Sequence, residues 1–537
     1  MTDNNGQEPR RLGPGDWPWV VSAAVICGLL RLLFAARRGF WLDEYYTFQA
    51  TQATIADMIP ERFSAGHSPL YFLYARLFAI AFGTSETALR ASSALAASLA
   101  VVATAGLAAR LGLRRLLKPL LVLAVFHPYW QVIGTEFRYM MPLACLGAFW
   151  SWAVVAHLQD RSRRTAAAVM LVGAIALWVH GSAQFILASL TIYILLELRD
   201  GTERRARPAR GLEALLPLVG AFGLSLPLIM GLRMMPKVAA EATTDIPSLR
   251  KAITNQVQTF FGDDVVFRSA TGLNDDVFTF VFLAVYAFAV VAAIRFHRRS
   301  DTPREAGRYL VATLVGLPVV VMIITAVGKD VEGPARYVAF LSVPALLLIA
   351  LLWSEAGSWG KRGMALRLVM ALTIGSSWTL QALDQGEWHR ETIQWLAAHR
   401  SPDQPIVTAG RAVNQLALRY HGVKPVGELA GLSSDQSEAA VPLLLLREKL
   451  QHSDSMFFLL YHEGDIPVAE VLAKLREEGT LTFTRVWQPS GRVALLGLAR
   501  TEKGRQELEA LPAIDPPRIT HSPVREKERK ALKWGLE

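Results

Sequence analysis

Residues 17–36 read WPWVVSAAVICGLLRLLFAA and carry one charged side chain, Arg31. A helix rises about 1.5 Å per residue, so a run of this length covers the roughly 30 Å hydrocarbon core of a bilayer. The run VFTFVFLAVYAFAVVAAI at 277–294 has the same character. Lipid offers no partners for backbone N–H and C=O groups, so such runs form helices rather than open strands. The sequence therefore predicts an α-helical protein that crosses the membrane several times.

The composition agrees with this prediction. Of the 537 residues, 52% are hydrophobic and 19% are charged, whereas soluble domains carry about 25% charged residues. The formal net charge is +10, and the excess lies in short loops between apolar runs. This distribution argues against nucleic acid as a partner and indicates the bilayer instead. Cys27 and Cys145 both lie within apolar runs, so they indicate neither a disulfide framework nor a metal cluster.

About eleven apolar runs are candidate transmembrane spans. They cover residues 17–36, 88–108, 119–133, 140–157, 165–180, 183–198, 213–231, 277–294, 309–327, 337–352 and 365–382. The first run lacks a small-residue cleavage site, so we expect a retained anchor rather than a removed signal peptide.

Lysine and arginine in the connecting loops predict the orientation, because basic loops stay in the cytoplasm. With residues 1–16 in the cytoplasm, all the strongly basic loops fall on that side. These loops contain Arg110, Arg114, Arg115 and Lys118; Arg161, Arg163 and Arg164; Arg199, Arg204, Arg205, Arg207 and Arg210; Arg298, Arg299, Arg304 and Arg308; and Lys361, Arg362 and Arg367. The predicted location is a bacterial inner (cell) membrane, with multiple passes and an extracytoplasmic or periplasmic C-terminal part.

The longest connections fall on the opposite, outer face. The first of them, 37–87, contains two short apolar segments. Residues 55–63 have apolar side chains at helical spacing, and 68–82 is apolar but too short to span comfortably. We expect both to be interfacial helices.

The pattern changes after residue 382. Helix-like and strand-like segments alternate over 383–501, which predicts a small α/β domain on the outer side. Residues 502–537 are charged and punctuated by proline, and are expected to form a tail. Residues 17–382 form the predicted transmembrane domain.

Several polar side chains cluster on the predicted outer face. Asp43 and Glu44 lie in FWLDEYY (40–46), directly after the first span. The other candidates are His67, Glu136, Arg138, Tyr139, His180, Lys329, Arg336 and Tyr337. Each one alone is explained as an interfacial cap, a structural ion pair or a polar loop residue. Polar groups at membrane depth are costly and usually face a cavity, so their common location favours a functional site.

Taken in order, these motifs resemble a known family. The order is Asp43-Glu44 after the first span, then His67-Ser68-Pro69-Leu70-Tyr71, then Gly83-Thr84-Ser85-Glu86 with Arg90, then Arg138-Tyr139, and finally Arg336-Tyr337. The set resembles the GT-C glycosyltransferases over roughly residues 17–350. Within them it is most similar to the protein-mannosyltransferase-like group, which includes protein O-mannosyltransferases, lipid A aminoarabinose transferases and rhizobial lipopolysaccharide galacturonosyltransferases. The family often has His-Pro-Pro-Leu where this chain has His67-Ser68-Pro69-Leu70, which leaves the sugar open.

The resemblance implies a GT-C-like catalytic domain over 17–382 and an inverting transfer. A sugar on a polyprenyl-phosphate carrier is the implied donor, and a hydroxyl of a glycolipid, glycan or protein is the implied acceptor. Asp43 is expected to be the general base, with Glu44 orienting it or holding the acceptor. Arg138 and Arg336 are expected to hold the phosphate, with Lys329 as an added charge. Glu136, His180, Tyr139, Tyr337 and His67 complete the expected substrate site.

Three alternatives remain open at this stage. No cofactor is certain, although Asp43 and Glu44 together offer hard oxygen ligands for a divalent cation. A polytopic transporter or flippase for a glycolipid or other anionic solute also uses charged residues in a helical bundle, although no internal repeat is evident. A scaffold or receptor would act through its outer domain and would not need the charged loop residues.

The topology is open to a direct test. A reporter that is active only outside the cytoplasm is expected to be silent when fused near Arg205 and active when fused near Gly422. The reason is that Arg205 lies in a predicted cytoplasmic loop, whereas Gly422 lies in the predicted outer domain. The opposite activity at either site would contradict the eleven-span arrangement.

Overall fold

The computed structural model describes residues 10–200, 207–233, 275–298, 303–316, 339–383, 389–409, 413–423, 427–428, 440–461, 468–487 and 493–514. The chain divides into two compact units. The first, a helical bundle, comprises Met1–Ala35 and Ala50–Ala382. The second comprises Ala36–Gln49 and Leu383–Glu537, so a short segment from the start of the chain belongs with the C-terminal domain.

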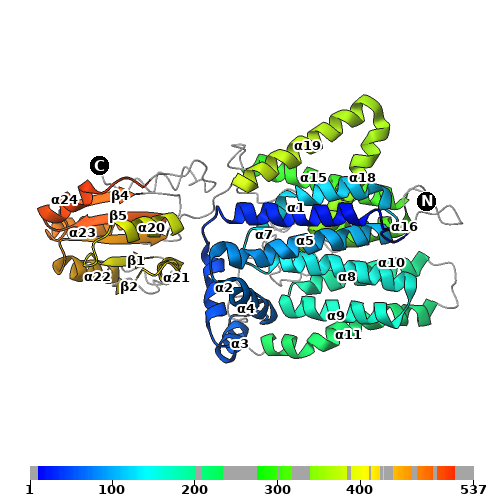
Figure 1. The fold of residues 1–537 in the computed structure, drawn as a ribbon, viewed down its shortest axis with the longest axis horizontal. Helices are drawn as coiled ribbons and strands as arrows, with labels where there is room; N and C mark the ends of the chain where they lie inside the picture. Colours follow the sequence, from blue (N-terminus) through cyan, green and yellow to red (C-terminus); the bar gives the residue numbers. More distant parts are fainter. Residues whose placement is uncertain are drawn as a thin grey trace. The chain divides into compact units, whose positions relative to one another are not determined.

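Helices of different lengths make up the bundle (Figure 1). They are α1 (Trp17–Ala35), α5 (Glu86–Arg110), α6 (Leu117–Val125), α7 (Pro128–Gly134), α8 (Met140–Asp160), α9 (Arg163–Val179), α10 (Ala183–Asp200), α11 (Arg207–Arg233), α15 (Asp275–Arg298), α16 (Arg304–Val311), α18 (Ser342–Ala356) and α19 (Gly360–Leu383). Each predicted span has a helix among the described residues, although 309–327 is described only as far as Gly316. By length and composition alone, five described helical segments are apolar enough to cross a membrane, or six if one bent pair counts as a span.

Close packing of α1 and α5 depends on small residues, as is common where helices associate in lipid (Figure 1). A Cβ atom at Gly28 of α1 would lie 2.3 Å from Ser98 Oγ of α5, which is too close for any side chain. The outward face of α1 is apolar instead, with Leu29 60% exposed and Leu33 54% exposed. Such a surface is stable only in contact with lipid.

The predicted span 119–133 is broken rather than straight. Helices α6 and α7 meet at an angle of 51°. Pro128 begins α7, and a proline at this position loses no hydrogen bond because the first N–H groups of a helix have no partner within it. The side chain of His127 accepts a hydrogen bond from the N–H of Trp130. The proline and this cap explain why one apolar run forms two helices.

Three short helices follow α1: α2 (Leu42–Gln52), α3 (Ile55–Ser64) and α4 (Leu70–Phe82). The last two match the short helices predicted over 55–63 and 68–82. Helix α3 is capped by Thr54, whose side chain accepts from the N–H of Asp57. Arg76 of α4 donates to the carbonyl oxygens of Thr51 and Ala53, which ties α4 to the α2–α3 connection.

The C-terminal unit contains a five-stranded sheet of order β2-β1-β3-β5-β4. Its strands are β1 (Ile406–Ala409), β2 (Gly427–Glu428), β3 (Ser455–Tyr461), β4 (Phe483–Trp487) and β5 (Val493–Ala499). Strand β1 is parallel to β2 and β3, whereas β5 is antiparallel to β3 and β4. Helices α20 (His389–His399), α21 (Val413–Tyr420), α22 (Ala440–Gln451), α23 (Val468–Glu477) and α24 (Glu502–Ala510) complete this unit.

An apolar core holds this domain together, with Phe458 of β3, Leu496 of β5, Leu446 of α22 and Leu472 of α23 almost fully buried. Residues 502–510, which the sequence assigns to the charged tail, form α24 instead. Leu508 is buried, and the side chain of Thr501 caps the helix. Arg485 of β4 also donates to the backbone oxygens of Leu508 and Glu509, so a buried leucine, a cap and these hydrogen bonds attach the charged segment to the domain.

Candidate active site

The two adjacent carboxylates lie in the first turn of α2 and have different surroundings. Glu44 is fully buried, and its Oε2 accepts a hydrogen bond of 3.2 Å from the N–H of Trp41. This contact is half of a capping box, in which an acidic side chain at the third helical position satisfies the cap residue. Asp43 is half-buried, and its backbone oxygen accepts from Thr47 Oγ1 at 2.9 Å. The helix N-terminus stabilises negative charge at both carboxylates.

Aromatic contacts join this carboxylate segment to the C-terminal domain within the second unit. The ring of Tyr420, at the end of α21, lies 5.2 Å from Phe40, 5.9 Å from Tyr45 and 4.8 Å from Phe48, measured between centroids. Phe40 and Tyr45 also contact each other edge to face at 5.5 Å. These rings surround Asp43 and Glu44 in the sequence, so Tyr420 fixes the stretch that carries the carboxylates.

Hydrogen bonds hold the same segment at its start. The guanidinium of Arg390 in α20 donates to the backbone oxygens of Ala36, Arg37 and Arg38, at 3.3, 3.0 and 3.5 Å. Burial, with the charge of Arg390, lowers the pKa of the neighbouring His421 to about 4. His421 is therefore neutral at neutral pH and adds no further positive charge beside Arg390.

A second cluster lies within the helical bundle, where α7 meets α8 and α9 meets α10. Tyr139 stacks on His180, with ring centroids 3.8 Å apart and planes inclined by 6°. The Arg138 guanidinium lies 5.4 Å from the centroid of the Tyr139 ring, and Tyr71 meets the same ring edge-on at 6.1 Å. Two segments distant in the sequence, those of Tyr71 and His180, thus converge on Tyr139.

Two further predicted residues border this cluster. His67 contacts Phe72, which in turn contacts Tyr71, so the His67 segment joins the cluster through two aromatic rings. The backbone oxygen of Glu136 accepts a 2.6 Å hydrogen bond from Ser93 of α5, which fixes the loop before Arg138. Glu136 and Arg138 are each 7% exposed.

The structure therefore brings together His67, Glu136, Arg138, Tyr139 and His180 in the bundle, and Asp43 with Glu44 in the second unit. Lys329, Arg336 and Tyr337 lie outside the described residues. No group of three His, Cys, Asp or Glu side chains suited to a metal ion occurs among the described residues.

Sequence reasoning did not assign a role to Tyr71, Arg90 or Tyr420. Tyr71 ends the motif His67-Ser68-Pro69-Leu70-Tyr71, so its position in that motif was the available signal. Arg90 is 1% exposed and donates to the backbone oxygen of Ala35 at 3.0 Å, which links α5 to the end of α1. Tyr420 gives no signal of its own, because its partners lie almost four hundred residues earlier.

Comparison with known proteins gives no match to a family model and no match among curated proteins. Among solved structures, ArnT from Cupriavidus metallidurans in the apo state aligns with a TM-score of 0.52 and 13% identity, over 91% of this chain and 99% of that one. ArnT is a GT-C lipid A aminoarabinose transferase. The chain has the GT-C fold.

Two further solved structures are similar. The oligosaccharyltransferase AglB from Archaeoglobus fulgidus, in complex with an inhibitory peptide and a dolichol-phosphate, aligns with a TM-score of 0.49 and 13% identity, over 91% of this chain and 74% of that one. ArnT from Cupriavidus metallidurans bound to undecaprenyl phosphate gives a TM-score of 0.39 and 14% identity, over 91% of this chain and 99% of that one. The alignment with apo ArnT at a TM-score of 0.52, together with the helices and the sheet described above, confirms the prediction of a GT-C-like, multi-pass helical membrane protein with a small C-terminal α/β domain.

The contacts of Tyr420 lead to a prediction. Tyr420→Ala removes three aromatic contacts, each worth about 0.5–1.5 kcal/mol, so local opening of residues 40–48 is expected to rise by about tenfold or more. Amide hydrogen exchange of the peptide covering this segment measures the opening. Tyr420→Phe keeps the ring and should exchange like the wild type.

Phe483→Ala, which removes a ring elsewhere in the domain, is the matched control. Unchanged exchange in Tyr420→Ala would show that Tyr420 does not hold the segment.

Proposed function

We propose that this protein is a glycosyltransferase that moves a sugar from a polyprenyl-phosphate carrier to an acceptor hydroxyl. The reaction takes place at the outer face of a bacterial inner membrane, with the C-terminal domain on that face. The observation that carries this proposal is the GT-C fold together with Asp43, which lies at the N-terminus of α2 only eight residues after α1 ends at Ala35. In the sequence, this position puts a carboxylate directly after a membrane span, and a lipid carrier presents its phosphate at the membrane surface.

The donor is proposed from the fold and from the cluster around Tyr139. The ArnT of Cupriavidus metallidurans has been solved with undecaprenyl phosphate, and we extend a carrier of that chemistry to this chain. Arg138 offers a planar guanidinium suited to two phosphate oxygens, and Tyr139 and His180 offer groups for sugar or phosphate oxygens. Lys329, Arg336 and Tyr337 are proposed to complete the phosphate site on the basis of the sequence motif alone.

The proposed reaction is a single displacement with inversion. The carboxylate of Asp43 accepts the proton of the acceptor hydroxyl as that oxygen attacks the anomeric carbon of the sugar. The bond between the anomeric carbon and the phosphate oxygen breaks, and the electron pair leaves with the carrier phosphate. Arg138 stabilises the negative charge that grows on this phosphate.

Glu44 has a different proposed role. Its buried carboxylate accepts a hydrogen bond from the backbone N–H of Trp41. We propose that this hydrogen bond stabilises the helical turn that contains Asp43. Within the GT-C enzymes we propose the protein-mannosyltransferase-like group, on the ordered motifs of residues 43–139. The acceptor is proposed to be a glycolipid, a glycan or a protein of the cell envelope.

The first test separates the two carboxylates. The glycoconjugate that disappears from the cell envelope when the gene is deleted identifies the product, and its formation rate is then measured with purified variants. Asp43→Asn keeps the size of the side chain but removes the base, so the rate is expected to fall about 10²–10⁴-fold. Glu44→Gln keeps an oxygen that accepts from Trp41 and should lose less than about tenfold. Near-normal turnover by a folded Asp43→Asn protein would exclude Asp43 as the base.

The second test concerns the carrier phosphate. Arg138→Lys keeps the charge but loses the bidentate geometry, so binding of undecaprenyl phosphate is expected to weaken about ten- to hundredfold. Native mass spectrometry of the purified protein, with the lipid titrated, measures this change. Arg164→Lys, an equal substitution at the start of α9, is the control. Equal lipid binding by wild type and Arg138→Lys would contradict the phosphate site.

A further inference from the structure

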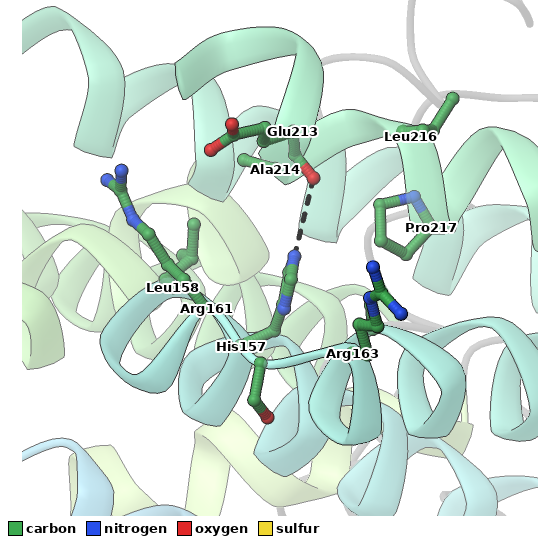
Figure 2. A pocket seen from close by; sticks show the side chains of 10 residues that line it. His157, Leu158, Arg161, Arg163, Glu213, Ala214, Leu216 and Pro217 are labelled. Atoms are coloured by element: carbon green, nitrogen blue, oxygen red, sulfur yellow. Dashed lines mark hydrogen bonds between the residues drawn. The ribbon is translucent and has the colours of Figure 1, made fainter. Parts of the chain in front are cut away.

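A pocket lies at the other end of the bundle, away from the Tyr139 cluster. It has a volume of about 210 Å³ and lies between the end of α8, the start of α9 and the first turns of α11 (Figure 2). The side chains that matter here are His157, Arg161, Arg163, Glu213 and Leu216. None of them belongs to the proposed active site.

The floor of this pocket is rigid. His157 is 7% exposed, and its Nε2 donates to the backbone oxygen of Glu213 at 3.3 Å, which joins α8 to α11 (Figure 2). Its Nδ1 lies 3.1 Å from Thr165 Oγ1. Ser162 and Thr165 form a capping box at the start of α9, so the loop between the two arginines is fixed by hydrogen bonds.

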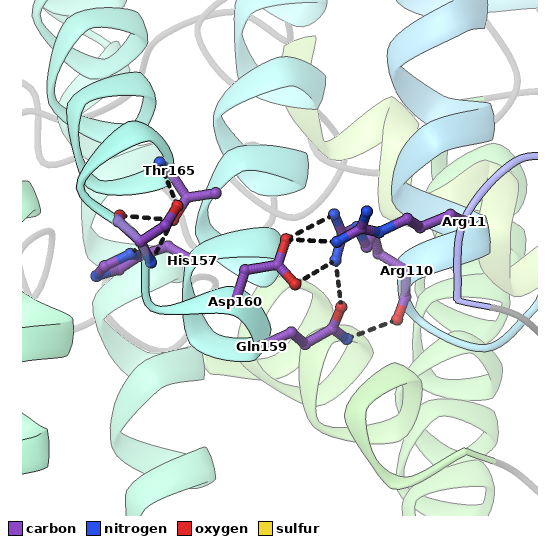
Figure 3. A network of polar contacts seen from close by, with 7 residues as sticks. Arg11, Arg110, His157, Gln159, Asp160 and Thr165 are labelled. Atoms are coloured by element: carbon purple, nitrogen blue, oxygen red, sulfur yellow. Dashed lines mark hydrogen bonds and ion pairs between the residues drawn. The ribbon is translucent and has the colours of Figure 1, made fainter.

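The two arginines of the pocket differ from Arg11 and Arg110, which lie nearby. Arg110 and Arg11 both bind Asp160, at 2.9 and 3.2 Å, so this carboxylate neutralises part of their charge (Figure 3). Arg161 and Arg163 are exposed and have no ion pair among the described residues. Figure 2 shows both side chains extending toward α11, on either side of His157.

The charge of the pocket is positive. Two arginines line it against one carboxylate, that of Glu213, and no ion pair joins Glu213 to either arginine in the described structure. Guanidinium groups are strong donors to phosphate oxygens, so two of them lining one pocket favour a phosphate group as the ligand.

Apolar surface lies next to this positive charge. On α11, Leu212 is 67% exposed, Leu216 is 59% exposed and Val219 is 61% exposed. On α9, Leu171 is 60% exposed. In a membrane protein such side chains contact acyl chains, so the pocket meets lipid on its apolar side and water on its charged side.

We propose that this pocket binds the phosphate headgroup of an anionic phospholipid. Arg161 and Arg163 bind the phosphate oxygens, and the acyl chains lie along Leu212, Leu216 and Val219 of α11. Basic pockets between transmembrane helices on the cytoplasmic side are known to take anionic headgroups. The bound lipid joins the ends of α8, α9 and α11, and its role is separate from that of the polyprenyl donor.

The test compares two neighbouring arginines that carry equal charge. Arg163 lines the pocket, whereas Arg164 is exposed beside it and does not. The purified full-length protein is titrated with phosphatidylglycerol, with phosphatidylcholine and with inorganic phosphate, and bound lipid is counted by native mass spectrometry. Phosphatidylglycerol is expected to bind more tightly than phosphatidylcholine. Arg163→Gln is expected to weaken its binding about fivefold or more, and Arg164→Gln should leave it within about twofold of the wild type.

Arg161→Asn is a second pocket variant, since asparagine tolerates the left-handed backbone at that position (φ 46°). This substitution is expected to weaken the binding of phosphatidylglycerol by about as much as Arg163→Gln does. Three results would overturn the proposal: equal losses in Arg163→Gln and Arg164→Gln, equal binding of both phospholipids, or displacement of phosphatidylglycerol by millimolar inorganic phosphate. The first two indicate a diffuse charge effect, and the third indicates a free phosphate as the occupant.

Discussion

Every backbone N–H and C=O group inside the hydrocarbon must find its partner within the protein, and this constraint governs the whole bundle. It is met by long helices, and it confines irregular backbone to places where a side chain compensates. The break between α6 and α7 is one example, because His127 caps the second helix. Arginine side chains do the same at this break and at the end of α1. Arg31 of α1 donates to the backbone oxygen of Val125 at 2.5 Å, and Arg90 donates to that of Ala35.

The sequence predicted those features that depend on local pattern. The length of the apolar runs predicted the spans, and helical spacing over 55–63 predicted α3. The proline at 128 marked a possible break, but apolar content alone made 119–133 look continuous. The helix at 502–510 was missed because its composition is charged, and its attachment depends on tertiary contacts, namely the burial of Leu508 and the hydrogen bonds from Arg485 of β4.

The candidate site was predictable to a similar extent. The predicted topology put Arg138, Tyr139 and His180 at the same end of the bundle, and in the structure they meet around one stacked pair of rings. The different surroundings of Asp43 and Glu44 were not predictable, because only the position of the helix start shows that Glu44 accepts a hydrogen bond from the N–H of Trp41. The contact between Tyr420 and Phe40 could not be predicted either, because the periodicity of a sequence does not reveal contacts between residues so distant in the chain.

That link has a consequence for biosynthesis. Phe40 is made early and Tyr420 late, and 380 residues separate them (420 − 40). At about 5–20 residues per second, a ribosome needs roughly 20–80 seconds to cover this distance. During that time α1 and the helices that follow it enter the membrane, while the segment that carries Asp43 lacks its aromatic partner Tyr420. A nascent or prematurely ended chain thus has an assembled bundle with a loose carboxylate segment, and the last domain to be synthesised completes the first loop.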